Sequence, residues 1–435
     1  MSMVIVYPNS AGLDVHKKFL IACRLTVDDQ GQVHQAVRRF STMTDDLEAL
    51  ADWLAEGGIT HVAMESTGVY WQPVYNILED RFELYLVNAQ SIKRMSGRKT
   101  DMKDAEWIAT LMQHGLLQRS FIPDRQQREL RDLTRYRLSL VDERNRFANR
   151  LQKVLEGTNI KLASVASDMQ GVSAQAILRA LLAGQSDAEA LAKLAKGRLR
   201  SKQDELVRAL KGHLREHHRW LLAELLVQLD FLDEQIEKIE QRIEATLAQM
   251  PPFLEAVRLL DTIPGIDRHL AILIVAEIGV DMSRFPSDRH ITAWAGVAPG
   301  NNQTGGKQRS GQTRKGNKYL QRGLALAAHG AARKKDCYLR SLYYRLSARR
   351  GKARATVAVG RTILQMVFHM LQRGEEYREL GASYLDQRDR QHTSKRLIKR
   401  LEALGFIVNV KERSDAAMPI SSSQPTSLSA LPLVT

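Results

Sequence analysis

Short apolar runs separated by polar turns characterise the first part of the chain. Three of them are rich in β-branched and aromatic residues and predict strands over Val4–Tyr7, Phe19–Thr26 and Val33–Phe40. Asp45–Ala55 instead repeats its apolar positions at helical spacing, which predicts a helix with Thr44 as its N-terminal cap.

Two further apolar runs, Thr60–Met64 and Glu83–Val87, predict buried strands, each followed by a helix. The predicted order is therefore strand, strand, strand, helix, strand, helix, strand, helix. This order is typical of an α/β domain in which helices pack on a mixed sheet.

Residues 125–250 combine helical periodicity with a high density of charge. Apolar residues recur there at alternating spacings of four and three, with charged or amide residues between them. Such a seam predicts a helical hairpin or a coiled coil between two copies, and a long helix of an ordinary bundle is the alternative. The seam consists of Leu225, Leu229, Leu232, Ile236, Ile239, Ile243 and Leu247.

Pro251 and Pro252 mark the start of another unit. Two predicted helices follow, Phe253–Thr262 and His269–Ile278, and the tight turn Ile263–Ile266 joins them. This pattern resembles a helix-hairpin-helix, whose turn amides and second helix can hold a DNA phosphate without reading base sequence. An ordinary helical hairpin is the alternative.

These patterns predict four segments. An α/β domain over residues 1–122 precedes a helical or coiled-coil segment over 123–250. A mostly helical, basic domain covers 251–410, and the Ser- and Pro-rich tail over 411–435 is predicted to be disordered.

Basic residues exceed acidic ones. The 435 residues carry a formal net charge of +15, and 44% of them are hydrophobic, which is typical of a globular protein. Residues 301–400 contain 24 Lys and Arg against six Asp and Glu, a surplus of 18. This surplus favours a polyanionic partner, because basic side chains displace counterions from phosphates. A basic protein without such a partner is the alternative.

Cysteines are few and long apolar segments are missing. Cys23 and Cys337 cannot build a disulfide framework or a zinc finger, which favours a reducing cytoplasm. Residues 1–10 lack the basic start and apolar core of a signal peptide. Leu270–Val280 contains Glu277 and is shorter than the roughly 20 residues of a membrane helix. We therefore expect a cytoplasmic protein without a membrane partner.

Four acidic residues are candidate metal ligands: Asp14, Glu65, Asp101 and Asp104. The first two lie beside predicted strands, and the last two are three apart, so that a helix would place them on one face. Hard divalent cations such as Mg²⁺ or Mn²⁺ prefer oxygen ligands, and four converging carboxylates could hold two ions for phosphoryl chemistry. Helix caps and turns are the alternative role for each acid.

The residues around these acids resemble a known family. They are similar to the DEDD transposases of bacterial insertion elements, which include Piv-type site-specific invertases, over about residues 10–345. The N-terminal segments that carry the resemblance are Gly12–Lys17, Met64–Trp71 and Lys99–Ala105. The C-terminal segments are Ile263–Ile266, Phe285, Ala293–Gly300, Gly305–Lys307 and Thr313–Asn317.

This resemblance implies a first domain of the ribonuclease H and Holliday-junction resolvase (RuvC-like) class. It implies that Asp14, Glu65, Asp101 and Asp104 are Mg²⁺ ligands and that the activity is cutting and joining of double-stranded DNA. It also implies a structured non-coding RNA from the element that pairs with donor and target DNA. A dimer or tetramer at the bacterial nucleoid is expected, because exchange between two duplexes needs at least two active sites.

The resemblance further implies a C-terminal serine nucleophile just before a Gly-Lys pair. Thr304 stands at that position here, so the chain departs from the pattern. A threonine hydroxyl can act as a nucleophile, although its methyl group crowds the attack. Ser310 in the same glycine-rich segment is the alternative, and a loop without a nucleophile is a third.

The same segment has the composition of a phosphate clamp, because glycines let backbone amides approach an anion and basic side chains add charge. It does not match a nucleotide-binding P-loop, since Asn301 stands where the first glycine is required and Gln308 follows the lysine. The basic candidates for nucleic-acid binding are Lys307, Arg309, Arg314, Lys315 and Lys318.

The sequence therefore predicts a Mg²⁺-dependent transposase or site-specific recombinase. A junction-resolving nuclease without a covalent intermediate, the first alternative, would need the four acids but neither hydroxyl. A non-enzymatic nucleic-acid-binding protein, the second, would need only the basic segment and the helical seam.

Overall fold

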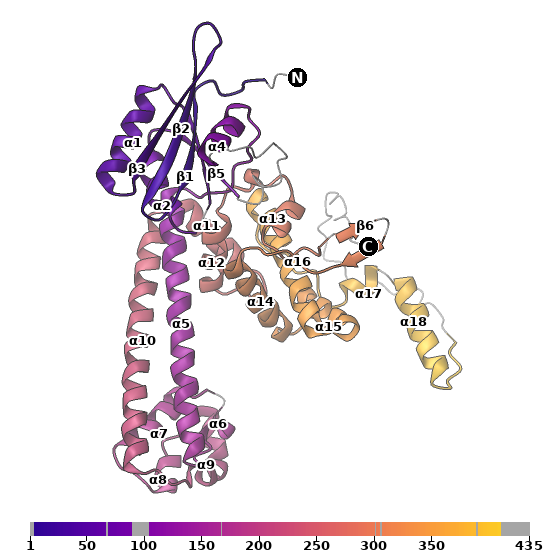
Figure 1. Ribbon diagram of the computed structural model, residues 1–435. Coiled ribbons are helices and arrows are strands. Elements are labelled where there is room, and N and C mark those ends of the chain that lie inside the picture. Colours follow the sequence, from indigo (N-terminus) through magenta and orange to yellow (C-terminus); the bar gives the residue numbers. More distant parts are fainter. Residues whose placement is uncertain are drawn as a thin grey trace. The chain divides into compact units, whose positions relative to one another are not determined.

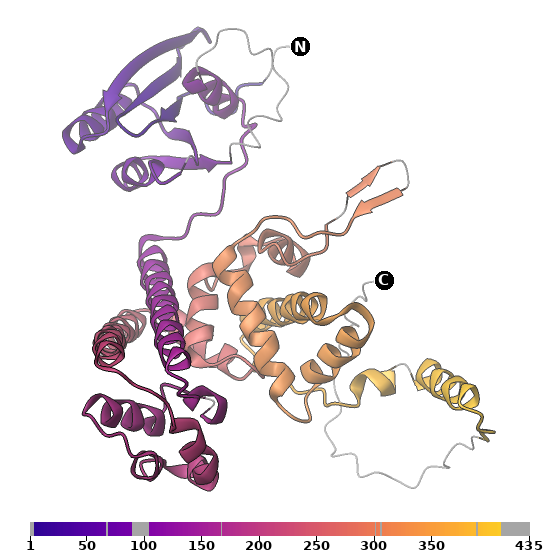
Figure 2. The ribbon, with the colours of Figure 1, turned by 60° about the horizontal axis from the view of Figure 1, so that its bottom comes forward.

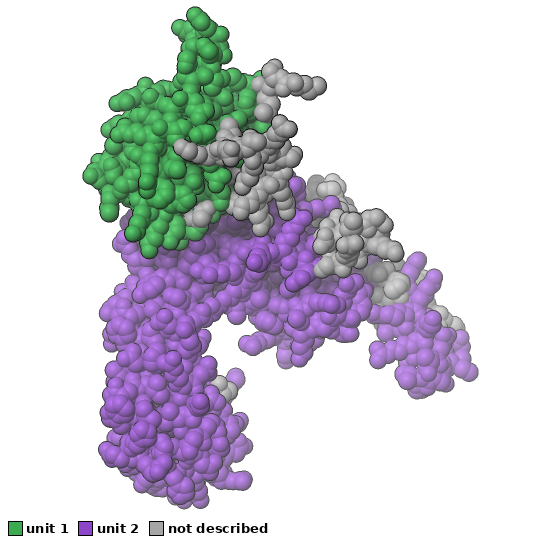
Figure 3. Space-filling model, viewed as in Figure 1, with its two compact units in different colours: residues 1–126 green, residues 127–435 purple. Residues whose placement is uncertain are grey.

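The computed structural model describes residues 4–66, 68–88, 104–166, 168–300, 302–304, 307–388 and 390–409, without the side chains of residues 302–304, 307–310 and 392–393. The chain divides into two compact units, residues 1–126 (unit 1) and 127–435 (unit 2), which Figure 3 shows in different colours. The predicted tail over 411–435 lies outside the described residues.

Unit 1 contains a five-stranded mixed sheet in the order β3-β2-β1-β4-β5 (Figure 1). The first three strands pair antiparallel, whereas β4 pairs parallel to β1 and β5 pairs parallel to β4. The predicted mixed sheet is thereby confirmed. The strands are β1 (Ser10–Val15), β2 (Phe19–Val27), β3 (Val33–Ser41), β4 (His61–Glu65) and β5 (Glu83–Val87).

Helices cover both faces of this sheet. On one face, α1 (Thr44–Glu56) and α2 (Trp71–Leu78) bury their leucines against Leu13 and Met64. On the other face, α4 (Asp104–Gln113) packs against β1, β2 and β4 (Figure 1). The central strand β1 is therefore covered on both sides, as expected of a strand at the middle of an α/β sheet.

Gly12 is the point of closest approach between β1 and α4. A Cβ atom there would lie 2.3 Å from the backbone nitrogen of Ala109 and 2.4 Å from the backbone oxygen of Ala105, so only glycine lets the helix lie this near. Cys23 is paired with Gly12 across the sheet and is buried under the same helix. Burial, with a smaller contribution from Glu106, raises the pKa of this thiol to about 12 and keeps it protonated.

Two sequence predictions in unit 1 are wrong. Val4–Tyr7 is not a strand: its two valines are exposed, and β1 begins at Ser10 instead. The true strand contains small residues on the side where α4 approaches, so its sequence lacks an obvious apolar run. The predicted cap, Thr44, is the first residue of α1, and Met43 precedes it without a capping side-chain hydrogen bond.

Two antiparallel helices of 33 residues each form the arm of unit 2 (Figures 1 and 2). They are α5 (Arg125–Gly157) and α10 (Glu216–Ala248). The ion pairs between them join Arg137 to Glu240 and Arg144 to Asp233. All seven residues of the predicted seam are buried or half-buried along α10. Packing within one chain accounts for the seam, and a coiled coil between two copies stays a prediction.

Between the two arm helices, residues 158–215 form a small helical subdomain, here called the distal subdomain. It has a core of its own and lies at one end of the arm (Figures 1 and 2). Its elements are α6 (Leu162–Val165), α7 (Val172–Leu182), α8 (Ala188–Ala192), the 3-10 helix η1 (Gly197–Lys202) and α9 (Gln203–Leu210).

The remainder of unit 2 is a mostly helical body with a large buried core. None of the helices in the described ranges is long and apolar enough to cross a membrane. The helices are α11 (Pro251–Asp261), α12 (Arg268–Ile278), η2 (Met282–Arg284), α13 (Asp288–Trp294), α14 (Lys318–Arg333), α15 (Tyr338–Arg350), α16 (Lys352–Arg373), α17 (Tyr384–Arg388) and α18 (Arg390–Ala403). A hairpin of β6 (Asn302–Thr304) and β7 (Lys307–Ser310) lies between α13 and α14.

A buried carboxylate connects three helices of unit 2. Glu277 of α12 has no exposed surface. Arg135 of α5 donates two hydrogen bonds to this carboxylate, at 2.8 and 2.9 Å, and Nε of Arg131 lies 3.4 Å from it. Asn317, which caps the amino end of α14, donates a third hydrogen bond at 2.5 Å. Burial lowers the pKa of Arg131 to about 10, so this partner stays charged at neutral pH.

Replacing Gly12 with alanine is expected to push α4 away from the sheet. Overpacking of this kind costs about 1–3 kcal/mol, because the new methyl group overlaps backbone atoms of Ala105 and Ala109. Hydrogen–deuterium exchange should show faster exchange of the α4 amides. Gly157→Ala is the control, since a methyl group there meets nothing within 4 Å. Unchanged exchange in the Gly12→Ala protein would contradict the packing described.

Glu277→Ala is expected to lower the free energy of unfolding by about 3–5 kcal/mol, because two partly buried arginines lose their counter-charge. Urea denaturation followed by far-UV circular dichroism measures this loss. Glu255→Ala removes an exposed carboxylate that pairs with Arg258 on one helix face, and it is expected to have little effect. Equal losses in both variants would refute the importance of burial.

Candidate active site

Asp14 and Glu65 lie at the carboxyl ends of neighbouring parallel strands. The β1–β4 register pairs Leu13 with Met64, so Asp14 and Glu65 occupy the next matched position. Matched residues of parallel strands point to the same face, and successive residues point to opposite faces. Leu13 and Met64 pack toward α1 and α2, so the two carboxylates point to the face that α4 covers.

Asp104 brings a third carboxylate to this region. It is the first described residue of α4, which runs opposite to β1. Ala105 lies over Gly12, whereas Gln113 at the other end of α4 accepts a hydrogen bond from the N–H of Tyr7, before β1 begins. The amino end of α4 therefore lies at the end of β1 where the first acid stands.

These carboxylates suit a hard divalent cation by their chemistry and their partial exposure. Asp14 is one-quarter exposed and its Oδ2 lies 3.0 Å from Nε2 of His16, Glu65 is half-buried, and Asp104 is exposed. Across the described ranges, no three acidic, histidine or cysteine side chains are close enough together to hold an ion. Asp101, the fourth expected ligand, lies outside the described residues.

His16 lies beside Asp14, and the sequence alone assigns this histidine no role. It is exposed, stacks near Phe19 with ring centroids 4.7 Å apart, and contacts the Asp14 carboxylate. Because residues two apart along an extended chain point to the same side, its spacing from Asp14 is the signal that could have identified this contact.

The two candidate nucleophiles lie at opposite ends of the β6–β7 hairpin. Thr304 is the last residue of β6 and pairs with Lys307 beside the turn, whereas Ser310 pairs with Asn302 at the base. Their side chains and that of Arg309 lie outside the described part of the chain. The backbone register nevertheless separates the two hydroxyl positions, so one of them at most can occupy a given reactive point.

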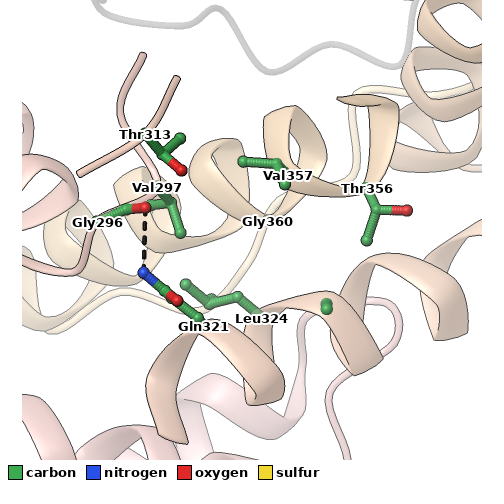
Figure 4. Close-up of a pocket in the computed structure, with 9 residues that line it drawn as sticks. Gly296, Val297, Thr313, Gln321, Leu324, Thr356, Val357 and Gly360 are labelled. Carbon is green, nitrogen blue, oxygen red and sulfur yellow. Dashed lines mark hydrogen bonds between the residues drawn. The ribbon is translucent and has the colours of Figure 1, made fainter. Parts of the chain in front are cut away.

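The loop after the hairpin, residues 311–317, packs against the backbone of Ala295. A Cβ atom at Gly316 would lie 2.3 Å from the backbone oxygen of Ala295, and Gln321 of α14 donates a hydrogen bond to the same oxygen at 3.0 Å. Figure 4 shows Gln321 and Thr313 beside a cavity of about 100 Å³. This cavity has room for only a few water molecules.

Three of the basic candidates are described with their side chains. Arg314 and Lys315 in the loop and Lys318 at the start of α14 are exposed, and Nζ of Lys318 lies 5.0 Å from the ring centre of Tyr319. The amino end of α14 places Lys318 beside the loop, so the three cations form a basic edge that can contact phosphates.

The turn between α11 and α12 packs inside the body. Gly265 has a φ of +91°, and a Cβ atom there would lie 2.3 Å from the backbone oxygen of Ala327 in α14. Asp267 caps α12 by accepting a hydrogen bond from the N–H of Leu270 at 2.8 Å. The turn therefore makes its contacts inside the protein. This favours the ordinary helical hairpin over a turn whose amides bind DNA.

Comparison with known proteins identifies the family. Residues 11–160 match a DEDD-type, IS110-type model described as a transposase, and residues 257–345 match the model of the IS116/IS110/IS902 transposase family. A probable family 20 transposase of Pseudomonas aeruginosa is 25% identical over 274 residues, which cover 62% of this chain and 70% of that protein. The chain therefore belongs to the DEDD transposase family of IS110-type insertion elements, and its activity is that of a DNA transposase.

Proposed function

We propose that this transposase cuts and joins DNA strands with residues from both units. Asp14, Glu65, Asp101 and Asp104 would hold Mg²⁺ or Mn²⁺, and the β6–β7 hairpin would supply the nucleophilic hydroxyl. The observation that carries this proposal is the matched position of Asp14 and Glu65 on the sheet face under the amino end of α4.

The sheet supports a ribonuclease H or RuvC-like assignment for unit 1. Its three antiparallel strands are followed by two parallel ones, in the order β3-β2-β1-β4-β5, and helices cover both faces. The acids at the carboxyl ends of the adjacent parallel strands are placed where an α/β sheet commonly presents its functional groups.

The proposed chemistry needs no nucleotide cofactor. A bound divalent ion supplies Lewis-acid activation at a DNA phosphate. The hydroxyl oxygen of Thr304 bonds to the phosphorus, and a DNA hydroxyl leaves. A hydroxyl of the second strand then attacks the same phosphorus, which joins the strands and frees the threonine. Each step exchanges one phosphoester for another, so ATP is not required. Arg314 and Lys315 would hold the strand by its phosphates.

The proposal includes two partners. The first is a structured RNA of the element that pairs with DNA, and its support is the family resemblance together with the basic segment over residues 301–400. The second is another copy of the chain, in a dimer or tetramer, because exchange between two duplexes needs at least two active sites.

Asp14→Asn and Glu65→Gln should lower strand cleavage by more than about 100-fold, because even outer-sphere partners of metal ligands typically contribute 10–100-fold. DNA affinity should change little. Cleavage of labelled element-end duplexes, with the element's RNA and with Mg²⁺ or chelator, measures both effects. Asp29→Asn, at an exposed turn residue, is the matched control. Full cleavage by the Asp14→Asn protein would eliminate the proposed metal site.

Thr304→Ala should abolish a covalent protein–DNA adduct, while Thr304→Ser and Ser310→Ala should keep it, because only a hydroxyl at residue 304 is required. Denaturing gels and mass spectrometry of the DNA-linked peptide identify the attachment residue. An adduct on Ser310 would identify Ser310 as the nucleophile instead. Cleavage without any adduct would favour the junction-resolving nuclease.

A further inference from the structure

The distal subdomain contains an open groove of about 540 Å³ between α7 and η1. One wall includes Lys196, Arg198 and Lys202, and the other includes Gly171, Val172 and Ser173 at the amino end of α7. The groove belongs to residues 161–256, which lie between the two segments that match the family models. Family membership therefore assigns it no role.

The η1 wall is strongly basic. Residues 193–202 contain five Lys or Arg and no Asp or Glu, and all five are exposed. Among the described residues, no carboxylate forms an ion pair with any of them. Other arginines of unit 2 do pair, as Arg179 does with Asp230 at 2.8 Å. A cluster of like charges without counter-charges favours binding of a polyanion.

The walls hold each other in place. Oγ of Ser173 accepts a hydrogen bond from the backbone N–H of Lys196 at 2.8 Å, which ties the start of η1 to α7. Gly171 caps α7 without a side-chain hydrogen bond, so the first helix amides add positive potential to the groove. Asp168 is the acidic residue among the described lining residues, and its Oδ1 already accepts a hydrogen bond from the N–H of Gln170 at 2.9 Å.

No aromatic side chain lines the described groove, so it offers no platform for stacking unpaired bases. Cations without such platforms suit the phosphates of a duplex, which carry no sequence information. We propose that the distal subdomain binds the backbone of duplex DNA outside the reacting site, independently of base sequence. This proposal rests on the DNA transaction proposed above and adds a second contact region to it.

The test is the salt dependence of affinity for a random-sequence duplex of about 40 base pairs, measured by fluorescence anisotropy. The variant Lys196→Gln/Arg198→Gln/Lys202→Gln should lower the slope of log affinity against log salt by about two to three, since each lost phosphate contact removes roughly 0.9. The control Lys153→Gln/Arg208→Gln/Lys211→Gln removes the same charge from exposed residues that do not line the groove, and its slope should change by less than about one.

Equal slopes for the two triple variants would overturn the proposal. A change that appears only with structured RNA, and not with duplex DNA, would overturn it in favour of an RNA site. If the triple variant loses its circular dichroism melting transition, the three single substitutions replace it, each expected to lower the slope by about one. Asp14→Asn should keep the wild-type slope while losing cleavage, so failure of the catalytic proposal and failure of this one are distinguishable.

Discussion

The buried carboxylate of Glu277 is the interaction on which the organisation of unit 2 depends. Removing an ion from water costs several kcal/mol, and only well-placed opposite charges and hydrogen bonds offset this cost. Arg135 and Asn317 provide them from α5 and from the cap of α14. A single side chain thereby fixes the arm helix, the core helix α12 and the end of the loop over residues 311–317. The candidate phosphate clamp is positioned by a charge that never contacts solvent.

The proposed chemistry is divided between the two units. The acids stand at one edge of the sheet in unit 1, and the hydroxyls stand on a hairpin of unit 2. In this proposal, cutting a DNA strand requires groups from both units.

The sequence predicts a strand or helix well where the pattern depends only on residues that are neighbours in the chain. Glu83–Val87 matches β5 at both ends, because it is a short apolar run of β-forming residues bounded by turns. β1 is missed because a helix packs against its small residues, and the packing partner Ala109 is far away in the chain. The family motifs point to Asp14 and Glu65, but their shared face follows only from the strand register.

Long-range interactions explain the other omissions. In the sequence, Glu277 is a single acid in an apolar stretch. Its partners, Arg135 and Asn317, are distant from it along the chain. The basic groove is likewise invisible from sequence, because its second wall comes from α7. A cluster of cations without nearby acids over residues 193–202 was the available signal, although the larger surplus over residues 301–400 obscures it.

The equal length of the two arm helices has a consequence for how such proteins diversify. Since α5 and α10 are antiparallel and have 33 residues each, the chain leaves the body and returns to the same place. The arm can therefore be lengthened or shortened during evolution without altering the body, provided that both helices change together. Two helical turns take about seven residues, so paired steps of roughly 10 Å preserve the seam. Descendants of one element can thus place the proposed DNA contact of the distal subdomain at a different distance from the body while they inherit the same chemistry.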